Sequence, residues 1–557
     1  MDDTTQLDWV YAHERERPEV IWLTQPMGGG AIRELTFAQA LDEARRMATY
    51  LVGLGLPSGA RVAIFSKNTA WWLLADLAIW MAGHVSVPIY PTLTPDSIRR
   101  ILEHSEASLI FVGKLDRFAE MEPGLPKGLP RVSLPLAPFG AAGEGGRSWE
   151  DIVKESAPIA GEPRRAADDL ATLIYTSGST GEPKGAMHSF RSMSAATVVA
   201  EAFDFTRNDR MISYLPLAHV AERACMETIS FKLGFHVYFS ESLATFPQDL
   251  QRARPTIFGS VPRLWQKLEA GVYAKIPPSR LALLLRLPIV GRIVRQKVRA
   301  GLGLDQSRGF ITGSAPTPQE LVSFYRSLGM ELTELYGMTE NFAVSHYARP
   351  GEARVGYVGT PAPGVVAKLA ADGEVLVKSP GTMLGYYKNE ALTREMIDAE
   401  GFLHTGDRGE TDERGRLRIT GRVKELFKTS KGKYVAPAPI EGALVALPEV
   451  DQACVSGVGR PQPHALVVLS ATVRVDGATR DGIARQLESH LEATNATLDP
   501  HEHLDKLFVV PEEWTAENGL LTPTLKLRRA IIEEKYATRL PPLFTRPERI
   551  VWVEREG

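Results

Sequence analysis

Residues 170–185 read LATLIYTSGSTGEPKG, and this stretch gives the strongest single indication of fold and chemistry. The apolar run Leu170–Ile174 predicts a buried strand. The glycines after it let the backbone approach an anion, while hydroxyls, N–H groups and Lys184 suit phosphate oxygens. Proline before the lysine and glycine after it exclude a Walker A loop, and a solvated Gly/Ser turn is the alternative. The predicted phosphate-binding residues are Thr176, Ser177, Gly178, Ser179, Thr180, Gly181 and Lys184.

Strand and helix patterns alternate on the N-terminal side of this loop. β-Branched runs and helical patterns follow one another at residues 20–23, 37–54, 61–65, 69–82 and 85–90. Thr36 with Gln39 makes a capping box at one helix start, and Thr94 before Pro95 predicts another. The alternation predicts parallel sheet with crossover helices. The Pro- and Gly-rich stretch 123–146 predicts a flexible surface loop.

The rest of the chain divides into segments of different character. A second αβ stretch covers 173–335, and the glycine-punctuated segment after it predicts a small β-rich unit. Strands and amphipathic helices return after residue 420. At 557 residues the chain exceeds what one hydrophobic core usually serves. We predict an α/β fold whose large N-terminal domain combines αβ layers with a small β-barrel-like subdomain, followed by a smaller α+β C-terminal domain.

Composition excludes several classes of protein. The net charge of −3, from 64 basic and 67 acidic residues, provides no global field for nucleic acid. Cys225 and Cys454 are far apart, which argues against a disulfide framework or structural zinc and favours a reducing compartment. The N-terminus lacks a signal-peptide pattern, and the most apolar stretches, 71–83 and 281–298, are short or interrupted. We therefore expect a cytoplasmic protein without a membrane span.

Further motifs occur downstream of the glycine loop in a fixed order. They are LPLAHVAER at 215–223, FGSVPRLW at 258–265, FITGSAP at 310–316, ELYGMTE at 334–340, GFLHTGD at 401–407, ITGRVKE at 419–425 and LTPTLKLRR at 521–529. In this order, over residues 20 to 530, the chain resembles the adenylate-forming superfamily of acyl-CoA synthetases, luciferases and peptide-synthetase adenylation domains. The segments 215–223 and 258–265 look like those of long-chain acyl-CoA synthetases.

The resemblance implies a nucleotide site. Tyr336 would stack on adenine, Thr339 would meet the α-phosphate, and Asp407 would accept the ribose hydroxyls. Glu340 and Thr176 would hold Mg²⁺, which usually takes one or two protein ligands alongside phosphates and waters. The remaining residues assigned to ATP are Gly313, Ser314, Ala315, Pro316, Glu334, Leu335, Gly337, Met338, Ile419, Arg422 and Lys526.

The resemblance also assigns catalytic and hinge residues. His219 would lie near the substrate carboxylate, although a lone histidine can equally be structural. Lys526, with Thr339 and Lys184, would stabilise the transition state at the α-phosphate. Lys424 would form the hinge between an N-terminal domain at 1–421 and a mobile C-terminal domain at 422–557, with Lys428 serving thioester formation.

These assignments predict an ATP-dependent fatty acid–CoA ligase. A carboxylate and ATP would give acyl-AMP and pyrophosphate, and coenzyme A would then take the acyl group, with Mg²⁺ as cofactor. An acyl-AMP ligase that serves a carrier protein, and a medium-chain or aryl acid ligase, remain open. A luciferase-type oxygenase and a non-catalytic acyl-adenylate sensor rank below them. The oligomeric state is open, a homodimer included.

One segment suggests contact with lipid. Residues 275–303 hold seven basic residues, no acidic ones and the apolar run Leu281–Leu285. This composition suits peripheral contact with the inner face of a membrane. A solvated helix pair packed on the core by its leucines is the alternative, because Pro288 and Gly291 interrupt any long amphipathic helix.

Overall fold

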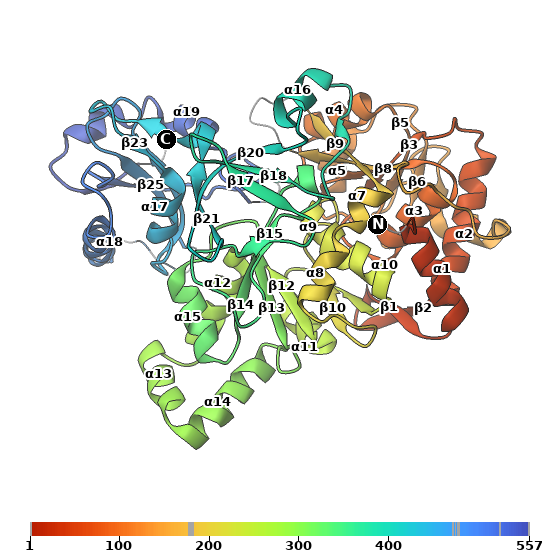
Figure 1. The fold of residues 1–557 in the computed structure, drawn as a ribbon, viewed down its shortest axis with the longest axis horizontal. Coiled ribbons are helices and arrows are strands. Elements are labelled where there is room, and N and C mark those ends of the chain that lie inside the picture. Colours follow the sequence, from red (N-terminus) through yellow and green to blue (C-terminus); the bar gives the residue numbers. More distant parts are fainter. Residues whose placement is uncertain are drawn as a thin grey trace.

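The computed structural model describes residues 3–176, 183–470, 473, 475, 479–522 and 525–554 (Figure 1). It has the predicted mixed α/β architecture, with a large N-terminal part and a smaller C-terminal one. The loop residues Ser177, Gly178, Ser179, Thr180 and Gly181 lie outside the described residues.

An eight-stranded sheet, counted over the described residues, forms the first layer. Its order is β19 (Gly385–Tyr386), β9 (Lys184–Ser189), β8 (Leu170–Thr176), β4 (Val85–Ile89), β3 (Arg61–Phe65), β5 (Ala107–Val112), β6 (Arg131–Ser133), β7 (Arg147–Ser148). The strands from β8 to β7 are parallel, as predicted, whereas β9 and β19 run antiparallel at one edge. Its helices include α2 (Phe37–Gly53), α3 (Ala70–Met81), α4 (Pro95–Ser105), α5 (Phe118–Met121) and α6 (Trp149–Glu155).

Both predicted helix starts are confirmed. Thr36 and Gln39 exchange the two hydrogen bonds of a capping box, and Thr94 accepts the N–H of Ser97 ahead of Pro95. The prediction of a flexible surface loop at 123–146 is wrong in part. This stretch contains β6 (Arg131–Ser133), and Val132 and Leu134 are buried. A three-residue strand is too short to show a periodic pattern.

Helix α3 is buried along its whole length, because its sequence AWWLLADLAIWM is apolar on every side. Its one charged residue, Asp76, pairs with Arg223, which also donates to Glu227 at 2.8 Å and to Thr172 at 2.8 Å. All three charged side chains are fully inaccessible to solvent. Arg223 begins a π-helical segment, Arg223–Thr228, so this ion cluster joins that segment to α3.

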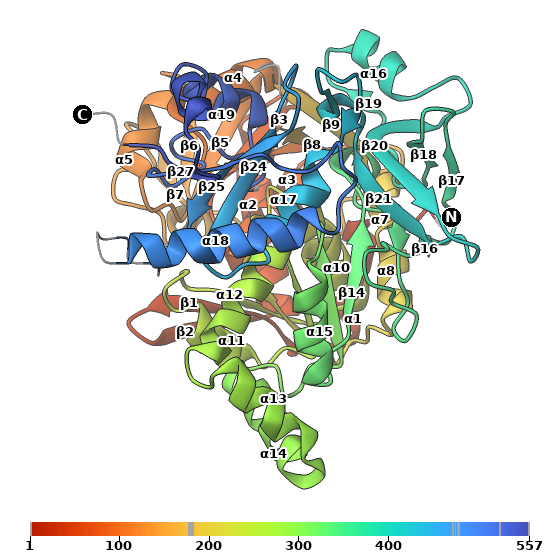
Figure 2. The same ribbon diagram turned by 90° about the vertical axis from the view of Figure 1, so that its left-hand side faces the viewer.

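A second layer contains two further sheets. The first has the order β10 (Arg210–Ser213), β11 (His236–Phe239), β1 (Ile21–Gly28), β2 (Ala31–Thr36), and the second β12 (Ile257–Ser260), β13 (Gly309–Gly313), β14 (Leu332–Tyr336), β15 (His346–Tyr347), β16 (Thr360–Pro361). The helices that accompany them are α1 (Gln6–Glu16), α7 (Phe190–Ser194), α8 (Thr197–Ala202), α9 (Val220–Glu222), α10 (Ile229–Leu233), α11 (Phe246–Ala253), α12 (Pro262–Tyr273) and α15 (Gln319–Ser327). Two more helices, α13 (Pro278–Arg286) and α14 (Pro288–Gly301), extend away from the body (Figures 1 and 2).

An antiparallel sheet forms the predicted small β-rich subdomain. Its order is β17 (Val366–Leu369), β18 (Glu374–Lys378), β20 (Leu403–Thr411), β21 (Leu417–Arg422), and α16 (Glu390–Met396) lies beside it. Register pairs Asp407 of β20 directly with Arg422 of β21. This pairing brings Asp407, predicted for the ribose, beside Arg422, which is also predicted to bind ATP.

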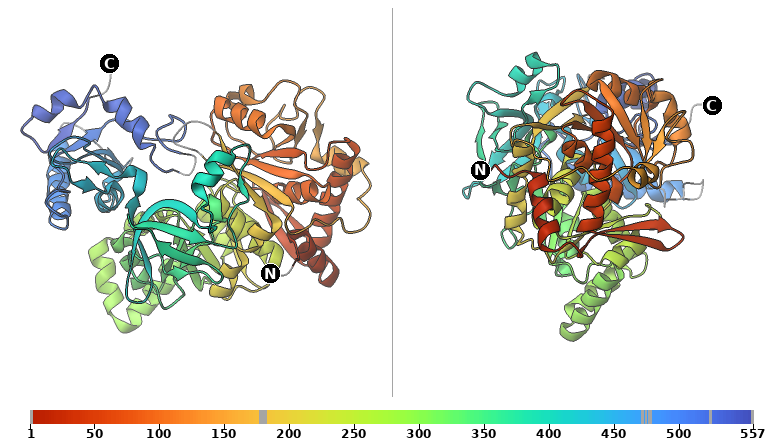
Figure 3. Two further views of the ribbon diagram at one scale, coloured as in Figure 1. Left: turned by 45° about the horizontal axis from the view of Figure 1, so that its top comes forward. Right: turned by 90° about the vertical axis from the view of Figure 1, so that its right-hand side faces the viewer.

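The C-terminal part begins after β21 and a short 3₁₀ turn, Val423–Glu425 (Figure 3, left). It contains β22 (Phe427–Lys428), β23 (Tyr434–Val435), β24 (Val450–Ser456), β25 (His464–Leu469), β26 (Leu507–Val510), β27 (Ile550–Trp552), α17 (Pro437–Leu444), α18 (Arg480–Asn495) and α19 (Arg529–Tyr536). Strands β24 to β27 form one sheet with its own hydrophobic core. The boundary at 421/422 stays a prediction, and it falls at the end of β21.

The described helices include none that is both long and apolar enough to cross a membrane.

Candidate active site

The antiparallel strands β8 and β9 flank the predicted phosphate loop. Thr176 at the end of β8 lies opposite Lys184 at the start of β9. The connection between them is outside the described residues. On β9, His188 is fully buried, and its Nε2 bonds the carbonyl of Thr339 at 2.8 Å. The strand that carries Lys184 is therefore fixed to the motif at 334–340.

That motif occupies the end of β14 and the turn after it. Glu334 accepts the backbone N–H of Thr317 at 3.0 Å, which ties it to the segment after β13. A Cβ on Gly337 would lie 2.5 Å from the backbone of Ala343, so only glycine fits there. A Cβ on Gly313 would likewise approach the carbonyl oxygen of Leu335 to 2.7 Å. Both glycines thus have a packing reason within the chain.

Glu340 and Tyr386 form a buried pair that the sequence did not predict. The hydroxyl of Tyr386 donates to Oε1 of Glu340 at 2.6 Å, and the two residues are 4% and 8% exposed. Desolvation and the nearby carboxylate both raise the pKa of Tyr386, so the phenol stays protonated and donates. The pairing fixes one carboxylate oxygen of Glu340.

The Glu340 carboxylate suits a magnesium ligand. Within the described residues no group of three or more His, Cys, Asp or Glu could hold a metal. Mg²⁺ needs no such group, because it keeps waters and binds substrate phosphates through one or two protein ligands. Glu340, with Thr176 at the end of β8, matches that demand, and the assignment stays a prediction.

Asp407 holds the next part of the site together. Its Oδ2 accepts the hydroxyl of Tyr336 at 2.7 Å, and its Oδ1 pairs with Nε of Arg422 at 2.9 Å. Burial and the Asp407 carboxylate raise the pKa of Tyr336, which keeps its hydroxyl a donor. The residues predicted for adenine and for ribose are therefore in direct contact.

His219 caps a short helix. Its Nδ1 accepts the N–H of Ala221 at 3.2 Å at the start of α9. Burial lowers the pKa of His219 to about 3, and the charge of Lys526 contributes to the shift. The ring is therefore neutral near pH 7, and the cap leaves its proton on Nε2. The cap is the structural role that the sequence allowed, and it leaves Nε2–H free to donate.

A polar cluster lies behind this helix. Oε1 of Glu222 accepts the hydroxyl of Ser213 at 2.8 Å and the N–H of Tyr214 at 3.1 Å. Asn68 donates to the same oxygen at 3.3 Å and accepts the N–H of Leu217 at 2.9 Å. Burial raises the pKa of Glu222 to about 8. The cluster fixes the loop between β10 and His219.

Lys526 reaches this site from the C-terminal part. Its turn is held by Thr522, whose N–H donates to the Lys526 carbonyl at 2.8 Å and whose hydroxyl accepts the Lys526 N–H at 3.0 Å. Desolvation and then the charge of Arg422 lower the pKa of Lys526, while Asp407, Glu340 and Glu425 oppose that shift. The lysine keeps solvent access. These interactions bring the two parts of the chain to one cluster.

The two lysines predicted for the hinge and for thioester formation lie on the surface. Lys424, in the 3₁₀ turn, pairs with Glu395 at 3.7 Å, and its side chain is 87% exposed. Lys428 on β22 lies 5.5 Å from the ring of Tyr434. Neither position contradicts the predicted roles, which stay predictions.

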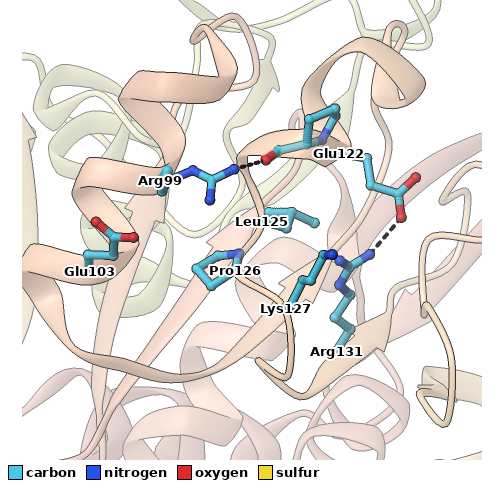
Figure 4. A pocket seen from close by; sticks show the side chains of 8 residues that line it. Arg99, Glu103, Glu122, Leu125, Pro126, Lys127 and Arg131 are labelled. Atoms are coloured by element: carbon cyan, nitrogen blue, oxygen red, sulfur yellow. Dashed lines mark hydrogen bonds and ion pairs between the residues drawn. The ribbon is translucent and has the colours of Figure 1, made fainter.

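A cavity of about 530 Å³ opens elsewhere, between α4 and β6 (Figure 4). Its lining consists of Arg99, Glu103, Glu122, Pro123, Leu125, Pro126, Lys127 and Arg131. Arg99 donates to the carbonyl of Pro123, and Arg131 pairs with Glu122 at 2.8 Å. No residue predicted for ATP, metal or acid lines this cavity, so the candidate active site lies elsewhere.

Comparison with known proteins identifies relatives over nearly the whole chain. The AMP-binding enzyme family matches residues 7–387, and the AMP-binding enzyme C-terminal domain matches 425–548. The chain is 32% identical to the long-chain-fatty-acid–CoA ligase FadD15 of Mycobacterium bovis, over 96% of both chains. It is 30% identical to long-chain-fatty-acid–CoA ligase 5 of Mus musculus, over 92% of this chain and 84% of that one.

Solved structures share the fold. The anthranilate CoA ligase AuaEII, in complex with anthranoyl-AMP, matches with a TM-score of 0.78 at 22% identity, over 96% of this chain and 98% of that one. The A-PCP didomain of carboxylic acid reductase from Segniliparus rugosus, in complex with AMP, matches with a TM-score of 0.81 at 22% identity, over 98% and 82%.

Proposed function

The chain belongs to the AMP-binding enzyme family, and on that premise we propose that it is an AMP-forming long-chain fatty-acid–CoA ligase. The observation that carries the proposal is the joined site at Asp407, which accepts the Tyr336 hydroxyl at 2.7 Å and pairs with Arg422 at 2.9 Å, near enough to Lys526 for these charges to act on its pKa. A cation from one domain among carboxylates of the other suits chemistry at a nucleotide phosphate. The long-chain ligases of Mycobacterium bovis and Mus musculus support the substrate class.

In the first half-reaction, a carboxylate oxygen of the acid attacks the α-phosphorus of ATP. A P–O bond forms, the bond to pyrophosphate breaks, and a mixed anhydride remains. Lys526, Lys184 and the hydroxyl of Thr339 stabilise the negative charge that develops on the phosphoryl oxygens. Neutral His219 offers Nε2–H to the acid. Glu340 and Thr176 would hold Mg²⁺, which would supply positive charge to neutralise the phosphates.

In the second half-reaction, the thiolate of coenzyme A attacks the acyl carbon. A C–S bond forms, the C–O bond to AMP breaks, and AMP leaves with the bonding electrons. Rotation about Lys424 would withdraw Lys526 and present Lys428 to the thiol substrate. The 3₁₀ turn Val423–Glu425 has no buried residue, and the Lys424 side chain is 87% exposed, which supports a hinge at this position.

Pyrophosphate release tests the substrate class. We expect release with saturated acids of 12 to 18 carbons to exceed release with benzoate and octanoate at equal concentration. A stronger response to benzoate would favour an aryl acid ligase. Coenzyme A and a purified acyl carrier protein should then be compared as acceptors of the preformed adenylate. Acyl transfer to the carrier protein alone would refute the ligase assignment in favour of the acyl-AMP ligase.

Cellular location and assembly belong to the proposal as well. We propose a cytoplasmic enzyme with peripheral contact at the inner membrane face. Cys225 and Cys454 are both unpaired, in keeping with a reducing compartment. A homodimer remains one form that light scattering can test.

A further inference from the structure

The helical hairpin α13–α14 has a distinct inner face. Leu281 and Val298 are buried in the core that α12 and α15 also line. Arg295 donates to the carbonyls of Ser327 and Leu285, at 2.9 and 3.3 Å. A Cβ on Gly291 would lie 2.7 Å from the Leu285 carbonyl, so glycine permits close packing of the two helices. The hairpin is thus a firmly built projection.

Its outer face is apolar. Of the nineteen exposed large hydrophobic side chains in the described residues, five lie within residues 283–293. Ile289 is 78% exposed, Leu283 62%, Ile293 48% and Leu287 46%. Leu283 lies on α13, Leu287 is the extended residue that joins the two helices, and Ile289 and Ile293 are four residues apart on one face of α14. Clustered exposure of this kind marks an interaction surface.

The charged residues of the segment 275–303 are all basic. Arg299, like Arg295, is tied to backbone carbonyls, at Leu304 and Ser307. The other five are exposed and have no hydrogen bond or ion pair to a described residue: Lys275, Arg280, Arg286, Arg292 and Lys297. No acidic residue occurs from 275 to 303. The cations that remain free therefore present one sign of charge beside the apolar tip.

We propose that the α13–α14 hairpin docks on the surface of an anionic phospholipid membrane. Exposed aliphatic side chains insert below the headgroups, while free Arg and Lys side chains meet lipid phosphates, which is the pattern of interfacial helices. Charge complementarity selects an anionic leaflet. The hairpin follows α12 directly, and α12 starts inside the segment FGSVPRLW, which resembles that of long-chain acyl-CoA synthetases.

Membrane docking would also give the enzyme access to its substrate, a consequence that rests on the proposed function. Long-chain acids partition into membranes, so a docked enzyme would meet its substrate where the acid is concentrated. Vesicle binding itself requires neither ATP nor acid, so it can be measured whether or not the enzyme proves to be a ligase.

The test is sedimentation of the full-length protein with vesicles of phosphatidylcholine, with and without 30% phosphatidylglycerol. The test variant is Arg286→Gln/Arg292→Gln/Lys297→Gln, three free cations whose loss removes no bond. Each cation contributes about five-fold to the partition coefficient, so we expect a loss on the order of a hundred-fold. Binding of the wild type should weaken as salt rises.

A matched control variant replaces three exposed basic residues outside the hairpin by glutamine. The variant Lys154→Gln/Arg414→Gln/Arg485→Gln removes three exposed cations from separate elements, and it should bind as the wild type does. A second test variant, Leu287→Ser/Ile289→Ser, should also reduce binding, because the tip loses the groups that insert.

Three outcomes would overturn the proposal. They are absence of wild-type binding to anionic vesicles at low salt, equal losses in the hairpin and control variants, and binding that does not respond to salt. Pyrophosphate release with octanoate, a water-soluble acid, should be equal in all four proteins. If pyrophosphate release were absent with octanoate and also with the acids of 12 to 18 carbons while vesicle binding followed the hairpin, the ligase assignment would fail and the docking surface would stand.

Discussion

Tyr386→Phe tests whether the buried hydroxyl on Glu340 matters for the metal. The substitution removes one bond, that of 2.6 Å to Oε1, and keeps the ring that packs at 4% exposure. A hydrogen bond to a charged group contributes about 1.5–3 kcal/mol, so we expect a lower thermal midpoint. Partners of metal ligands typically contribute about 10–100-fold to metal affinity.

The assay is the Mg²⁺ dependence of pyrophosphate release at saturating ATP and acid. We expect the Mg²⁺ concentration for half-maximal rate to rise about ten-fold, with little change in the KM for the acid. Tyr387→Phe is the control, because the neighbouring hydroxyl donates at 3.2 Å to the exposed Glu106. An unchanged Mg²⁺ dependence in Tyr386→Phe, at full saturation with ATP, would refute the assignment of Glu340 to the metal.

Three further predictions concern catalysis, the hinge and pH. Lys526→Ala should lower acyl-adenylate formation by about a hundred-fold or more, since it removes a cation from the α-phosphate. Thioester formation from supplied adenylate should be unaffected. If the two steps, measured separately, fell equally, the result would argue against this role of Lys526. Lys424→Pro should have the opposite effect, because proline fixes φ at a turn that must rotate; Lys424→Ala, which keeps backbone freedom, is its control. The pKa of Glu222 is raised to about 8, above its unfolded value, so stability is fully present below about pH 4.5 and is lost as pH rises toward 8. Glu222→Gln should flatten the decline of the thermal midpoint between pH 5 and 8, and an unchanged slope would contradict the assigned pKa.

Patterns among residues close together in the sequence predicted helix starts and strands. The capping box at Thr36 and the cap at Thr94 located two helix starts, and the β-branched run Arg61–Phe65 gave a strand with the same bounds. Alternating strands and helices predicted parallel sheet, which the strands from β8 to β7 form. Signals of this kind fail where a strand is short, as at β6.

Hydrogen bonds between residues far apart in the chain could not be predicted from the sequence. Tyr386 reaches Glu340 across 46 positions, and His188 reaches the Thr339 carbonyl across 151, with no period or spacing to join either pair. Ordered motifs predict which segments would form the site, because a resemblance carries their roles together, and this assignment stays a prediction. They could not predict that the Tyr336 hydroxyl would bond Asp407. Such a bond depends on side-chain geometry that only the folded chain defines.

The inaccessible trio of Arg223, Asp76 and Glu227 limits how this chain can change over time. A neutral residue at position 223 would leave two carboxylates buried without a partner, at a cost of about 3–5 kcal/mol. Well-packed apolar side chains at all three positions can be as stable as the ions they replace. A first change at Arg223 therefore passes through a poorly folding intermediate, whereas loss of either carboxylate first leaves Arg223 paired with the other. Related sequences that lack the arginine at this position are therefore expected to lack both carboxylates as well, whereas those that keep it should keep at least one.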